Sequence, residues 1–170
     1  MSLAQDLLEQ ARHLARREAR RPKQASLRRA VSAAYYAVFH LLIEEASRGV
    51  VAGDAGTTPL RPLVGRSYDH GEMRRVCNVW ASGGTMPAAV SAYIKPPFPA
   101  DLRVVADIFT RLQSRRHAAD YDTGTPLSRG ETLDQVELAA SAFAAWDRVR
   151  PTEEARVFLL SLLLWKSWTR

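Results

Sequence analysis

Hydrophobic positions recur every three to four residues along most of the chain, which is the spacing of one buried face of an α-helix. The clearest case is the segment SLRRAVSAAYYAVFHLLIEEASRG at residues 26–49. Its apolar stripe consists of Val31, Ala34, Tyr35, Val38, Leu41 and Leu42. Ser26 is expected to cap this helix and Gly49 to end it. Alternation with the period of a β-strand is almost absent, so the pattern predicts an all-α fold.

Five further helices are expected on the same grounds, over residues 2–20, 69–80, 99–121, 128–149 and 152–168. Asp69, Ser128 or Thr132, and Thr152 are side chains that can cap helix N-termini. Pro22 should lie beyond the end of the first helix, since proline disrupts a helix interior. The helix at 99–121 is expected to face inward through Leu102, Val105, Ile108, Phe109 and Leu112.

Two long segments rich in glycine and proline separate these helices, at residues 49–67 and 81–99, and are expected to be loops. A chain of 170 residues suits one domain that buries its own core. We therefore expect a single domain over residues 1–170, built as an up-and-down bundle of five or six helices. Its core should span about 1–150, followed by an apolar C-terminal helix at about 152–168.

The C-terminal run VFLLSLLLW, residues 157–165, is too short to span a bilayer, which takes about 20 apolar residues. We expect it to pack on the core or on a second subunit. Trp165 and Trp168 favour the second subunit, because aromatic side chains are enriched at interfaces.

Positive charge is concentrated near the N-terminus. Of the net charge of +6, residues 1–30 supply +5, from eight basic and three acidic side chains. On a helix, one face would carry Leu3, Leu7, Ala11, Leu14 and Ala15. Arg12, Arg16 and Arg20 would form a row on another face. This row is a candidate phosphate-binding surface, and a solvated basic face is the alternative.

Several classes of site find no support in the sequence. Cys77 is the single cysteine, so no intramolecular disulfide is possible, and the four histidines form no HExxH pattern. Glycine-rich nucleotide-binding loops and a GxSxG elbow are also missing. We expect no metal and no cofactor. The polar N-terminal run is unlike a secretory signal, and a cytoplasmic location is expected.

The segment RLQSRRHAADYD at residues 111–122 gathers arginine, histidine, aspartate and tyrosine side chains that suit either chemistry or structure. A neutral imidazole can remove a proton from a ribose hydroxyl, and guanidinium groups bind and stabilise phosphate charge. The structural alternative is that Arg116 and Asp120, like Asp107 and Arg111, form ion pairs one helical turn apart. Basic residues are also favoured at a helix C-terminus.

Three segments, LRRAVSAAYYAVFHLL, DHGEM and RRHAADYD, resemble in their order and spacing the HEPN-domain family of small prokaryotic proteins. The resemblance covers about residues 25–125. It implies a HEPN-like helical bundle that forms homodimers and often partners a minimal nucleotidyltransferase as the toxin of a toxin–antitoxin pair. Many such proteins look like metal-independent endoribonucleases that use an arginine and a histidine four to six residues further on, with two subunits completing one cleft.

The resemblance identifies Arg111 and His117, which have five residues between them, as one candidate pair. In the most similar branch, an arginine, three residues and then Asp-Tyr recur, which matches Arg116, Asp120 and Tyr121. Related toxins carry a tyrosine two residues after the histidine, where the antitoxin adenylylates them. This chain has Ala119 there, which leaves Tyr121 as a displaced target.

The candidate site residues form three groups. The catalytic candidates are Arg111, Arg116, His117, Asp120 and Tyr121. Candidates for binding RNA or nucleotide phosphates are Arg115, Arg12, Arg16 and Arg20, and supporting roles are assigned to Tyr36, His40 and His70. Tyr36 and His40 are alternatively packing residues, and the imidazole of His40 could bind a buried carbonyl or Asp120.

Three functions remain open from the sequence. The first is a HEPN-like protein that cleaves or binds RNA in a toxin or defence setting. The second is a non-catalytic bundle that binds a nucleotide or a partner protein. The third is an oligomeric assembly module.

Overall fold

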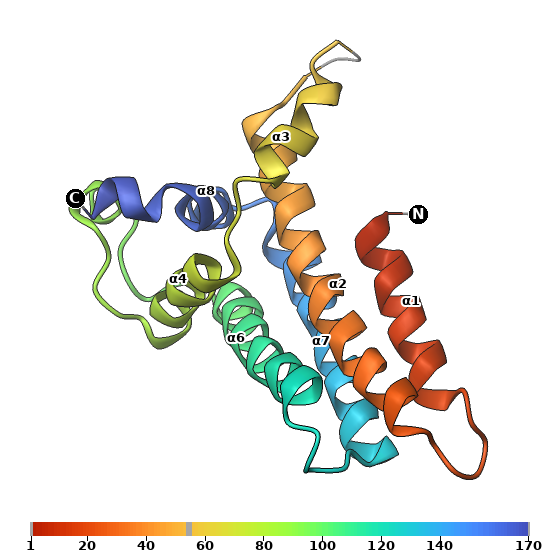
Figure 1. Cartoon of the computed structure of the whole chain (residues 1–170). Helices are drawn as coiled ribbons and strands as arrows, with labels where there is room; N and C mark the ends of the chain where they lie inside the picture. The colour runs from red at the N-terminus through yellow and green to blue at the C-terminus, as the bar shows by residue number, and fades with distance from the viewer. Residues whose placement is uncertain (1, 54–55, 170) are drawn as a thin grey trace. The chain divides into compact units, whose positions relative to one another are not determined.

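The computed structural model describes residues 2–53 and 56–169, and within them the regular structure is entirely helical (Figure 1). The α-helices are α1 (Leu3–Arg16), α2 (Gln24–Val50), α3 (Arg61–Gly65), α4 (His70–Ser82), α5 (Ala88–Ser91), α6 (Ala100–Tyr121), α7 (Arg129–Val149) and α8 (Glu153–Trp168), with a short 3-10 helix, η1 (Thr58–Leu60). The predicted all-α class is confirmed. The described residues form eight α-helices rather than five or six, because the two segments expected to be loops contain the short α3 and α5.

Most predicted caps are present. The Asp69 carboxylate accepts hydrogen bonds from the amides of Gly71 and Glu72, which start α4. Thr152 caps α8 in the same way. Ser128 and Glu131 form a reciprocal pair of bonds at the start of α7, with each side chain accepting from the other residue's amide.

Two boundaries of α2 differ from the prediction. The helix begins at Gln24, so Ser26 lies inside it, and the Ser26 hydroxyl donates to the Glu18 carboxylate at 2.9 Å instead of capping. Gly49 does not end the helix, which continues to Val50. Glycine is only about 1 kcal/mol less favourable than alanine inside a helix, so one glycine does not have to end it.

The first helix is shorter than expected and is rotated about its axis. It ends at Arg16, and beyond it the carbonyls of Glu18 and Ala19 accept hydrogen bonds from the Arg129 guanidinium instead of from helical amides. Arg20 is therefore not part of the predicted row on α1. The buried face consists of Ala4, Leu8, Ala11 and Ala15, and Leu3 is 52% exposed. The apolar stripe was wide enough to allow two neighbouring rotations, and its pattern alone did not choose between them.

The chain divides into two compact units. Unit 1 comprises Met1–Leu41 and Ile108–Ala144, and unit 2 comprises Leu42–Asp107 and Ala145–Arg170. Helices α2, α6 and α7 contribute residues to both units. In unit 1, the buried rings of Tyr35 on α2 and Phe109 on α6 lie 5.6 Å apart, which fixes these two helices against each other.

The core of unit 2 forms where α8 packs on α4. The Trp80 indole donates to the Ser161 hydroxyl at 3.0 Å, and its ring lies 5.4 Å from that of Phe158. Trp165 is only 4% exposed, so it packs inside this unit and does not face a partner as expected. None of the described helices has both the length and the apolar character needed to cross a membrane.

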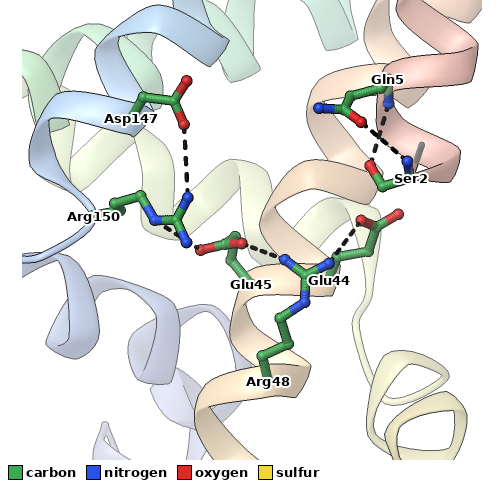
Figure 2. A network of polar contacts seen from close by, with 7 residues as sticks. All are labelled: Ser2, Gln5, Glu44, Glu45, Arg48, Asp147 and Arg150. Carbon is green, nitrogen blue, oxygen red and sulfur yellow. Dashed lines mark hydrogen bonds and ion pairs between the residues drawn. The ribbon is translucent and has the colours of Figure 1, made fainter.

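Charged side chains of unit 2 form a network at the end of α2 (Figure 2). Glu45 lies between Arg48, at 2.6 Å, and Arg150, at 3.9 Å. Arg48 also contacts Glu44, and Arg150 contacts Asp147. Figure 2 also draws, in unit 1, the capping box at the start of α1, in which Ser2 and Gln5 exchange hydrogen bonds. These contacts secure the ends of helices.

Candidate functional site

An open hollow of about 460 Å³ lies in unit 1 between one face of α2 and the C-terminal turns of α6; we call it the α2–α6 hollow. From α2 it is lined by Ala25, Arg28, Arg29, Ser32 and Tyr36, and from α6 by Arg116, Ala119, Asp120 and Tyr121. These positions follow each other at intervals of mostly three or four residues, which places them on one face of each helix.

Arg116 is held by three side chains at this surface. Its Nε lies 2.7 Å from Asp120 Oδ2 in an ion pair one turn along α6, and Nη2 donates to the Tyr36 hydroxyl at 3.0 Å. The guanidinium carbon also lies 5.4 Å from the centre of the Tyr36 ring and 6.0 Å from that of Tyr35, within cation–π range. These contacts orient the guanidinium.

Asp120 links the two helices. Its Oδ2 pairs with Arg116, and its Oδ1 accepts a hydrogen bond from the Ser32 hydroxyl on α2 at 2.6 Å. The Arg116 and Asp120 side chains are 24% and 25% exposed, so both remain accessible from the hollow.

Arg28 has a different set of partners from Arg116. Its guanidinium donates to the carbonyls of Ala119 and Asp122 at 2.7 Å and of Thr125 at 2.8 Å. These carbonyls are at the end of α6 and in the turn that follows, where no further turn of helix supplies amide donors. In the same turn, hydrogen bonds from Thr125 and from the Gly124 amide hold the pKa of Asp122 below its usual range. Arg28 therefore fixes the segment that carries Asp120 and Tyr121.

The charges that line the hollow favour an anion. Arg28, Arg29 and Arg116 contribute three positive charges, against one negative charge from Asp120. Arg29 is exposed, and Tyr121 is 68% exposed. Guanidinium groups bind phosphate oxygens in a planar fork, and an exposed aromatic ring offers a surface for stacking. The arrangement suits a phosphate joined to a flat or sugar-like group.

The structure separates the residues predicted on α6. Arg116, Asp120 and Tyr121 line the hollow, but Arg111, Arg115 and His117 do not. Arg115 lines a second pocket of about 140 Å³ together with Glu131 and Asp134. His117 is exposed, and its ring packs 4.8 Å from that of Tyr121. Arg111 and His117 are six positions apart, which on one α-helix turns them about 120° away from each other.

Of the supporting residues, Tyr36 lines the hollow and binds Arg116. His40, one turn further along α2, packs against the rings of Tyr36 and Phe39 and is not among the lining residues. The Asp120 carboxylate contacts Ser32 and Arg116. His70 begins α4 in unit 2, whereas the hollow belongs to unit 1.

The phosphate-binding row predicted on the first helix also lies apart from the lining residues. Arg12 and Arg16 are on α1, Arg20 follows it, and none of the three lines the hollow.

Three polar lining residues, Arg28, Arg29 and Ser32, were not predicted to belong to a site. A signal for them exists in the sequence, since positions 28, 29, 32 and 36 share one face of a helix, and that face is largely polar. Among the described residues, no group of three or more His, Cys, Asp or Glu side chains is placed to hold a metal ion.

Comparisons with known proteins give no significant match, whether to protein-family models, to curated protein sequences or to solved structures.

Proposed function

We propose that this protein binds RNA at the α2–α6 hollow. One observation carries the proposal: an open hollow of about 460 Å³ brings together three arginines, one aspartate and two tyrosines from helices distant in sequence. Arg116 and Arg29 bind the phosphate, and the exposed Tyr121 ring contacts the attached nucleoside. The net charge of +6 adds long-range attraction to a polyanion.

We further propose that the chain is a HEPN-like protein of a toxin–antitoxin or defence system. The support is that two of the three segments that resemble the family meet at the hollow: Ser32 and Tyr36 come from LRRAVSAAYYAVFHLL, and Arg116, Asp120 and Tyr121 from RRHAADYD. The proposal includes a HEPN-like helical bundle, a homodimer and a nucleotidyltransferase antitoxin as partner.

Metal-independent cleavage of RNA is a second candidate function, favoured by the exposed His117 ring beside Tyr121. On one helix, Arg111 and His117 face about 120° apart. Cleavage with this pair therefore requires that two copies of the chain contribute to one phosphate. The alternative pair is Arg116 and His117. It also requires two copies, because Arg116 lines the hollow of its own chain and His117 does not.

Binding is tested by fluorescence anisotropy with a labelled RNA in the presence of a chelator, over a series of salt concentrations. Release of counterions predicts that the logarithm of the affinity falls linearly with the logarithm of salt, by about 0.7 for each phosphate contacted on a single strand. A flat salt response would contradict phosphate recognition. Binding of mononucleotides without preference for RNA would favour the nucleotide-binding alternative.

Cleavage is tested by incubating the protein with RNA in chelator and identifying the product ends. Attack by a ribose 2′-OH leaves 2′,3′-cyclic phosphates, and loss of a general base typically slows such a step about 10²- to 10⁴-fold. The His117→Ala variant should lose this activity, with His13→Ala, on α1, as the matched control. Full activity of His117→Ala would remove the role assigned to this imidazole.

A further inference from the structure

Asp120 is the only carboxylate among the described residues that line the α2–α6 hollow. Its two oxygens have one described partner each, Arg116 Nε for Oδ2 and the Ser32 hydroxyl for Oδ1. A carboxylate offers about four acceptor positions, so two remain. The side chain is 25% exposed and lines the hollow, so a ligand there can approach it.

This carboxylate is unfavourable for a simple anion. A phosphate that approaches Arg116 also approaches the negative charge of Asp120, 2.7 Å from the same guanidinium, and like charges that close repel each other. The repulsion is offset if the ligand carries a hydrogen-bond donor next to its phosphate, because the donor binds the carboxylate. The ribose 2′-OH of RNA is such a donor, and DNA lacks it.

We propose that Asp120 is a specificity-determining residue, which accepts a hydrogen bond from a ribose 2′-OH while the adjoining phosphate binds Arg116 and Arg29. It thereby selects RNA over DNA. The inference rests on the proposed function, because it assigns sugar selectivity to the same hollow. Ser32 fixes the orientation of the carboxylate by its bond to Oδ1, which leaves the rest of the carboxylate free to face the ligand.

The first test uses the full-length wild-type protein and three labelled 12-nucleotide probes of one base sequence: RNA, DNA and 2′-O-methyl RNA. Binding is measured by fluorescence anisotropy in chelator at one salt concentration, and denaturing gels verify that the RNA stays intact. A hydrogen bond to a charged group predicts that RNA binds about tenfold more tightly than DNA. The 2′-O-methyl RNA keeps the sugar oxygen but has no proton to donate, so it should bind as weakly as DNA.

The second test compares Asp120→Asn with Asp122→Asn. Both substitutions remove one negative charge, and Asp122 is two residues further on but does not line the hollow. In Asp120→Asn the repulsion of phosphate is gone, so DNA should bind about fivefold to tenfold more tightly and the preference for RNA should fall to about twofold or less. Asp122→Asn should keep the wild-type preference. Circular dichroism and thermal unfolding establish that both variants fold.

The outcomes separate the two proposals. If none of the probes binds wild-type protein, the proposed RNA-binding function is wrong, and the inference fails with it. If RNA and DNA bind equally, or if 2′-O-methyl RNA binds as tightly as RNA, the function stands and the role of Asp120 is overturned. The role of Asp120 is also overturned if Asp120→Asn and Asp122→Asn change the preference for RNA over DNA equally, since the effect is then one of net charge. If Asp120→Asn does not fold, the wild-type comparison still overturns the inference when RNA and DNA bind equally.

Discussion

Arg28 and Arg116 line the same hollow, but their partners give them different roles. Arg28 donates to three backbone carbonyls, which a ligand cannot replace without loosening the end of α6. The described partners of Arg116 are the side chains of Asp120 and Tyr36, so under the proposed function a phosphate can bind its guanidinium without loosening the end of α6. Under the proposed function, Arg28 is therefore a structural residue and Arg116 binds the ligand.

This difference predicts the behaviour of Arg28→Lys. A lysine ammonium is a point charge and lacks the planar fork that reaches three carbonyls, so the variant should lose about 1–3 kcal/mol of unfolding free energy. Urea unfolding measures the loss. The matched control is Arg29→Lys, the same substitution at the exposed neighbouring residue, which should change stability by no more than about 0.5 kcal/mol. Equal stability of the two variants would contradict the structural role of Arg28.

At this scale, sequence spacing predicted only part of the site. The pairing of Arg116 with Asp120 follows from their separation of one helical turn, and the structure contains that ion pair. It also places both residues at the hollow, so the structural and functional interpretations are compatible. The bonds from Arg116 to Tyr36 and from Ser32 to Asp120 join residues 80 and 88 positions apart. Periodicity within a helix contains no information on such contacts.

At the scale of helices, the prediction was accurate where a terminus is set by its own side chains. Asp69, Ser128 and Thr152 all cap the helices that they were expected to start. The prediction was wrong at the end of α1, where the carbonyls of Glu18 and Ala19 bind Arg129, a residue distant in sequence. Helix existence is thus decided by local patterns, and some helix ends and rotations are decided by tertiary contacts.

The contact between α6 and α7 in unit 2 predicts a pH dependence. Arg148 donates two hydrogen bonds to the Asp101 carboxylate, at 2.7 and 2.9 Å, and these bonds hold the pKa of Asp101 below its usual range. Because the folded pKa is depressed, the stabilisation is complete above the unfolded pKa of about 3.9 and is lost as the pH falls through the folded value.

Urea unfolding of wild type and Asp101→Asn should therefore differ at neutral pH and converge as the pH falls below about 4. The difference should be small, since Asp101 and Arg148 are 34% and 60% exposed and solvent screens the pair. In an Arg148→Gln background, Asp101→Asn should have no pH-dependent effect of this kind. If the difference in unfolding free energy between wild type and Asp101→Asn stays constant through the acid range, the assigned Asp101–Arg148 interaction is contradicted.

At the scale of the whole molecule, α8 retains an apolar surface after its inner face is buried. Leu160 is 39% exposed, and Val157 and Leu164 are half-buried. The proposed homodimer requires an interface, and aliphatic residues left in water at helical spacing are suited to one. We propose that this outer face of the C-terminal helix forms the interface, whereas Trp165 belongs to the core.

The dimer proposal predicts that Leu160→Arg halves the mass seen by sedimentation without changing thermal unfolding of the isolated chain. Leu63→Arg, which places the same charge at an exposed leucine of α3, should leave the mass unchanged. A wild-type protein that sediments as a monomer at micromolar concentration would contradict the homodimer.

The central claim, that the α2–α6 hollow binds RNA phosphate, is tested most directly by comparing RNA binding of Arg116→Gln and Arg115→Gln. These neighbouring arginines carry the same charge, but only Arg116 lines the hollow. Loss of a charged hydrogen bond should lower the affinity of Arg116→Gln for RNA roughly 10- to 100-fold. It should also reduce the slope of log affinity against log salt by about 0.7. Arg115→Gln should bind within about threefold of wild type. Equal losses of RNA affinity in both variants, or no loss in Arg116→Gln, would contradict the claim.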